Sequence, residues 1–220
     1  MSMVGTSGRG KLTGEAYERL REGILRGDIP VGSVLGEKAV SEALHMSRTP
    51  VREALRLLLK EGLLEVGTRR QVVVRGFTAE HRAEILEVRE AVEGIAVRHA
   101  CEVMSDDDLD YLRLLLLRQQ RASNDSREDD FIELDEEFHL RIAEGAQLPI
   151  IRDILGQLRG FVRVMRLGAS RHPSDLRQVL AEHQTILEAL ERRDVDAALT
   201  ALAAHLHKSE YVFAPADADC

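Results

Sequence analysis

The chain has 220 residues, of which 44% are hydrophobic, and its 30 Lys and Arg against 38 Asp and Glu give a formal net charge of −8. This length allows one large domain or two smaller ones. No apolar run is long enough to cross a membrane, and the first ten residues lack the apolar centre of a secretory signal. Two cysteines, Cys101 and Cys220, form neither a metal-binding pattern nor a disulfide framework. Composition therefore favours a cytoplasmic protein without membrane contact.

Helix and turn signals alternate in the first fifty residues, after an arm at residues 1–11 that we expect to be disordered. Residues 15–26 predict a helix, and the segment 27–32 ends it because Gly and Pro interrupt regular structure. Residues 37–44 predict a short second helix. Ser47 is typical of an N-cap whose hydroxyl accepts an N–H of the next helix. This order of elements is typical of a helix-turn-helix.

The helix after Ser47 has features of a DNA-reading helix. Its apolar residues recur at helical spacing, while Arg48 and Arg52 lie four residues apart, off that stripe, with Thr49 between them. Such a helix suits entry into a major groove. Ordinary solvated charges on a surface helix remain the alternative for this segment alone.

Two β-prone runs follow, at residues 63–66 and 71–74. The four residues between them include Arg69 and Arg70, so the pattern predicts a hairpin with a basic tip. Together with the preceding helices, this hairpin predicts a winged helix-turn-helix.

Residues 12–76 resemble the GntR superfamily of bacterial transcription regulators. The resemblance rests on the segments 27–32, 47–55 and 61–63, which occur in the family's order. It implies that six residues contact double-stranded operator DNA: Lys38, Arg48, Thr49, Arg52, Arg69 and Arg70. His45 stands where the family usually has Gly, which predicts strain in the turn because His adopts a left-handed conformation less easily.

The charge is divided unevenly along the chain. Residues 1–76 contain 13 Lys and Arg against 9 Asp and Glu, whereas residues 77–220 contain 17 against 29. The two parts therefore carry net charges of +4 and −12. This asymmetry favours a phosphate-facing surface on the first part, although chance composition would also explain a charge of +4.

Every predicted element from residue 78 onward is a helix. Starts are indicated at residues 79, 106, 149 and 173 and after Asp194, with a further helix that ends near Gly145. We therefore predict a mostly α protein, in which the winged helix-turn-helix is followed by an antiparallel helical bundle over residues 78–214.

A possible metal site lies within this bundle. Asp135 and His139 are four residues apart and so project from one helix face, while His183 and His205 lie on two later helices. Three imidazoles and a carboxylate suit zinc, and also nickel, manganese or iron. A hydrogen-bonded core histidine is the alternative for His183 or His205 taken singly.

The residues around these four positions resemble the FadR-type C-terminal ligand-binding domain, which implies that Asp135, His139, His183 and His205 hold a divalent cation. Arg89 lies on an inward stripe, where a buried guanidinium needs an anion. The resemblance favours a small carboxylate effector bound by Arg89, with Arg163 as a weaker candidate. A structural pair between Arg89 and Glu93 is the alternative.

These features predict a homodimeric regulator, expected to be a repressor, in which an organic acid alters operator binding. Two alternatives remain open: a regulator that senses the metal itself, and a metal-dependent enzyme. An enzyme is disfavoured because Glu136 and Glu137, the nearest candidate bases, follow Asp135 directly and point away from it on a helix.

Overall fold

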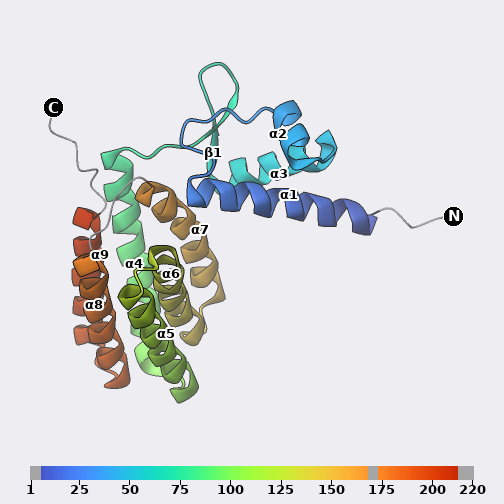
Figure 1. Cartoon of the computed structure of the whole chain (residues 1–220). Coiled ribbons are helices and arrows are strands. Elements are labelled where there is room, and N and C mark those ends of the chain that lie inside the picture. The colour runs from blue at the N-terminus through green and yellow to red at the C-terminus, as the bar shows by residue number, and fades with distance from the viewer. Residues whose placement is uncertain (1–5, 168–172, 213–220) are drawn as a thin grey trace, which may run out of the picture. The chain divides into compact units, whose positions relative to one another are not determined.

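The computed structural model describes residues 6–167 and 173–212, in which the chain forms two compact units (Figure 1). Of the described residues, the first unit contains 6–78 and 160–167, and the second contains 79–159 and 173–212. The described residues are predominantly helical, with a single two-stranded sheet, which confirms the predicted fold class. The elements are α1 (Thr6–Arg26), α2 (Glu37–Leu44), α3 (Arg48–Glu61), β1 (Leu64–Val66), β2 (Val72–Val74), α4 (Ala79–Val103), α5 (Asp106–Asn124), α6 (Glu128–Gly145), α7 (Pro149–Arg166), α8 (Pro173–Glu191) and α9 (Val195–Val212).

The first unit is a helix-turn-helix with a β-hairpin wing. Helices α1 and α3 pack together around an aliphatic core that includes Leu20, Ile24, Val51 and Leu58. Strands β1 and β2 pair antiparallel, with Leu64 opposite Val74. Burial of one face of each element thus fixes α3 and the hairpin in one unit, with their charged side chains outside the core.

The turn before α3 carries the strain that the sequence predicts. His45 has φ 55° and ψ 41°, in the left-handed region, and its backbone N–H donates to Glu42 at 3.3 Å. Ser47 stands at the N-cap of α3, but its hydroxyl makes no capping hydrogen bond, so that expectation was wrong. The physical reason is Pro50, which occupies the third helical position and lacks the N–H that a serine cap usually binds.

Helix α1 begins earlier than the sequence predicts. It starts at Thr6 rather than at residue 15, so residues 6–11 of the expected disordered arm are helical. Extending an existing helix requires no new nucleation, which explains why weak helix formers continue it. Residues 1–5 lie outside the described residues.

The second unit consists of helices α4–α9, apart from the last turns of α7, and the helix starts agree with the sequence prediction. The helices run alongside one another (Figure 1), with α9 packed against α4 and α8, and α5 against α6 and α8. Ser105 and Asp108 form a capping box that starts α5. Cys101 is buried in the aliphatic core, whereas Cys220 lies outside the described residues. In the described parts of the chain, helices long and apolar enough for a membrane span do not occur.

Candidate functional site

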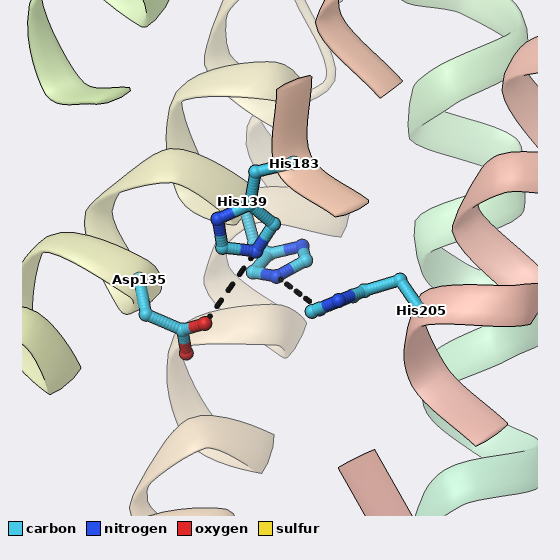
Figure 2. A group of neighbouring side chains, drawn as sticks. All are labelled: Asp135, His139, His183 and His205. Carbon is cyan, nitrogen blue, oxygen red and sulfur yellow. Dashed lines mark hydrogen bonds and ion pairs between the residues drawn. The ribbon is translucent and has the colours of Figure 1, made fainter. Parts of the chain in front are cut away.

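Four buried side chains from three helices of the second unit meet in the bundle core (Figure 2). Asp135 and His139 lie one turn apart on α6, His183 lies on α8, and His205 lies on α9. Each offers one ligand atom, and these atoms all lie within 4.8 Å of one another. Helical spacing therefore places two of the four donors on one face of α6, and tertiary packing supplies the other two.

The atoms that approach one another in this cluster are imidazole nitrogens and a carboxylate oxygen, which commonly bind metal ions in proteins. Nε2 of His139 and Nε2 of His205 are 3.2 Å apart, and Nε2 of His183 lies 3.5 Å from Oδ1 of Asp135. Two nitrogen lone pairs at such a distance repel each other unless a proton or a cation lies between them. Burial lowers the pKa of His183 well below its usual range, and burial also lowers the pKa of His205. Neutral imidazoles are the form that binds metals, so the donor set fits a divalent cation.

A ring of hydrogen-bond acceptors surrounds the three imidazoles on the opposite side. Nδ1 of His205 lies 3.0 Å from Oε2 of Glu182, and Nδ1 of His183 lies 2.9 Å from Oε1 of Gln119. Nδ1 of His139 lies 2.8 Å from Oε2 of Glu93, within ion-pair distance but bent away from ideal hydrogen-bond geometry. Every imidazole thus presents Nε2 to the cluster and Nδ1 to an acceptor outside it.

Arg89 forms the ion pair with Glu93 that the sequence analysis gave as the alternative to a carboxylate effector. Its Nε donates to Oε1 of Glu93 at 2.7 Å, one helical turn away, and both side chains are buried. Burial raises the pKa of the Glu93 carboxyl, but Arg89 and His139 outweigh burial and hold that pKa below its usual range. This hydrogen bond uses Nε of Arg89 and not Nη1 or Nη2, so the pair with Glu93 leaves part of the guanidinium for an anion.

Arg159 is a cation beside the cluster that the sequence analysis missed. Its Nη2 lies 3.1 Å from Oε2 of Glu136, and its Nε is buried without a partner. Burial lowers the pKa of Arg159 to about 10, with Asp135 and Arg89 close enough to act on it electrostatically. A signal was present, because Arg159 precedes Arg163 by one turn on α7. Arg163 belongs to the segment grouped with the first unit, and its effector role stays a prediction.

The residues considered as a catalytic base have other partners. Glu136 pairs with Arg159, and Glu137 accepts a hydrogen bond from the hydroxyl of Tyr111. His207, two residues after a cluster ligand, is exposed and lies 3.4 Å from Glu90. Both glutamates are therefore engaged by side chains outside the group of Asp135 and the three histidines.

The six residues expected to contact DNA are all exposed on the first unit. Lys38 lies on α2, three lie on α3, and the last two occupy the tip of the hairpin, where Arg70 has φ 58°. Arg52 is held by Glu37 of α2 through two hydrogen bonds of 2.8 Å. The full set is Lys38, Arg48, Thr49, Arg52, Arg69 and Arg70.

The first unit is a winged helix-turn-helix, and the second is a helical unit with a buried cluster of metal-binding residue types. Together they define the class of two-domain bacterial transcription regulators. Residues 12–74 match the model of the bacterial regulatory proteins of the gntR family, and residues 84–208 match that of the FCD domain. The chain belongs to the GntR family of bacterial transcription regulators, in the group with an FCD domain.

Curated and solved relatives agree with this assignment. The chain is 30% identical over 194 residues to the HTH-type transcriptional repressor RspR of Escherichia coli K12, across 88% of this chain and 85% of that one. It is 28% identical to the gluconate operon transcriptional repressor of Bacillus subtilis, across 81% and 75%. The solved structure of E. coli McbR/YncC superposes with a TM-score of 0.80 at 27% identity, across 92% and 96%. These relatives are transcription regulators and not enzymes.

Proposed function

We propose that the protein is a cytoplasmic, homodimeric transcriptional repressor whose second unit binds a divalent metal and a small organic acid. The observation that carries this proposal is the convergence of Asp135, His139, His183 and His205 within 4.8 Å. Zinc is the metal that this donor set suits best, while nickel, manganese and iron also accept it. Two relatives that are named repressors support the direction of regulation.

The charges around the cluster favour an anionic effector. Arg89 and Arg159 are cationic and buried, and the carboxylates of Glu93, Glu136 and Asp135 exceed them by one negative charge. The carboxylate of Glu182, beside His205, is neutralised by Lys208 at 3.3 Å. A divalent cation would leave this group with one net positive charge. A carboxylate ligand that bound the metal and a guanidinium would compensate that charge, because buried charge needs a partner. This balance supports an organic acid over the metal alone as the signal.

Regulation requires that the acid bind one arrangement of the dimer better than another. When bound, the metal would supply a Lewis-acidic contact for the carboxylate. Arg89 would orient the acid, since Glu93 fixes the direction of its guanidinium. Only a difference between the acid's affinities for the two arrangements of the dimer can alter operator binding by the first unit.

The test measures operator binding with three versions of the protein: metal-free, zinc-loaded, and zinc-loaded in the presence of small carboxylic acids. The operator is first obtained by selection from random double-stranded DNA. We expect zinc alone to change operator affinity little, and one or more acids to weaken it. A response to zinc alone would favour the metal-sensor alternative. Turnover of an acid by the purified protein would favour an enzyme.

A further inference from the structure

The acceptors around the three imidazoles differ in a way that bears on metal binding. A neutral imidazole carries one proton, on Nδ1 or on Nε2, and only the nitrogen without the proton can bind a cation. The cluster needs Nε2 to be free in all three rings. Whatever lies against Nδ1 therefore decides whether each ring is ready for the metal.

Two of the acceptors are carboxylates and one is an amide. An ionised carboxylate has no proton to donate, so Glu93 and Glu182 accept only, and the Nδ1 that faces each of them must carry the proton. Gln119 can turn its amide by 180° and present either oxygen or NH₂ to His183. Glu93 and Glu182 thus enforce one proton arrangement, whereas Gln119 permits both.

We propose that Glu93 and Glu182 are positioning residues which hold the protons of His139 and His205 on Nδ1 and so keep both Nε2 atoms open to a metal ion. The proposal rests on the metal site of the proposed function, to which it adds two residues that touch no metal. Arg89 belongs to the same arrangement, because it donates to Oε1 of Glu93 and leaves Oε2 to face His139.

This double contact makes Glu93 sensitive to an almost isosteric change. Glutamine has one acceptor oxygen, but the position faces two nitrogens: Nε of Arg89, which donates to Oε1, and Nδ1 of His139, which lies 2.8 Å from Oε2. If the oxygen serves Arg89, the NH₂ group faces His139 and forces its proton onto Nε2. Replacing Arg89 as well returns the oxygen to His139, so the double variant should recover what Glu93→Gln loses.

The experiment measures zinc affinity by competition with a chromophoric chelator, together with ¹⁵N NMR of the histidine side chains in the metal-free protein. We expect Glu93→Gln to lose about 10- to 100-fold in zinc affinity, with the His139 proton on Nε2. Arg89→Met with Glu93→Gln should regain most of that affinity and return the proton to Nδ1. Glu90→Gln, which removes a charge from a half-exposed residue of the same helix, should stay near the wild type.

Glu182→Leu is the second variant, because this side chain is partly exposed and its loss endangers the fold less. This variant should lower zinc affinity by about 10- to 100-fold. It should also shift the His205 proton from Nδ1 towards Nε2. Wild-type zinc affinity in Glu93→Gln and Glu182→Leu would overturn the inference, and so would a loss that the double variant does not recover. His139→Ala separates the two levels: if it also retains zinc, the metal site itself is wrong.

Discussion

Arg52 of α3 donates through Nε and Nη2 to both carboxylate oxygens of Glu37, each at 2.8 Å. The pair joins α3 to α2 on the outer surface of the first unit. Its two side chains are half-exposed, at 50% and 39%, so it contributes little to the free energy of unfolding. The pair instead fixes the orientation of the Arg52 side chain, because a contact through two hydrogen bonds sets the plane of the guanidinium.

Arg48→Ala and Arg52→Ala should each weaken operator binding, because a bidentate contact of Arg with a base is worth about 1–3 kcal/mol of discrimination. Fluorescence anisotropy with a selected operator measures the change. Arg56→Ala is the control, since Arg56 lies on the same helix and pairs with Glu53. Normal operator affinity in both variants would show that α3 is not the helix that contacts the DNA bases.

Glu37→Gln should raise the affinity for all DNA and lower discrimination. The substitution removes a negative charge near the phosphates and releases Arg52 from its fixed orientation. Affinities for the operator and for a scrambled duplex at one salt concentration give the ratio. An unchanged ratio would mean that Glu37 has no part in orienting Arg52.

His139→Ala, His183→Ala and His205→Ala should each reduce bound zinc and the stability that zinc adds. A ligand bound only by the native state stabilises it by about 2.7 kcal/mol at 100 times its Kd. Metal analysis and thermal melts with and without a chelator measure both effects. His207→Ala is the matched control, because this histidine is exposed and outside the cluster. Stoichiometric zinc in all three cluster variants would rule out the site.

Arg89→Met should abolish the response to the acid while operator binding and zinc binding persist. Methionine keeps much of the apolar stem and removes the charge. Glu93 keeps His139 as a partner at 2.8 Å, so the loss of stability should stay below the roughly 3–5 kcal/mol of a stranded buried charge. Calorimetry with the acid and a thermal melt test this. A collapsed melt, or unchanged affinity for the acid, would argue against Arg89 as the clamp.

His45→Gly should stabilise the first unit by about 1 kcal/mol, because a side chain in the left-handed region costs roughly 1–2 kcal/mol and glycine loses part of that gain in backbone entropy. Urea denaturation of the full chain is the measurement. His45→Ala is the control, since alanine keeps the Cβ that causes the strain at φ 55°. Equal midpoints for the glycine and alanine variants would show that the turn is not strained.

The sequence predicted the helices and the wing because helical periodicity and punctuating residues are local signals. The grouping of Asp135 with His139, His183 and His205 came from the resemblance to the FadR-type domain, because only Asp135 and His139 are related by helical spacing. Sequence prediction failed where a contact depends on a neighbour's chemistry. Ser47 has the residue type of a cap, but Pro50 removes the donor. Arg159 and Gln119 were missed because their importance comes from tertiary packing, which places them beside residues far away in the chain.

The four side chains of the cluster are separated by as many as 70 positions, from Asp135 to His205, and lie on α6, α8 and α9. The complete set exists only after α9 has docked on α4 and α8, so a chain with α9 undocked cannot bind the proposed cation with all four. Capture of the proposed cation by all four side chains then follows the docking of α9. Interactions that form after the folding transition state slow unfolding more than they speed folding. The cation would therefore act chiefly by slowing the unfolding of the helical bundle.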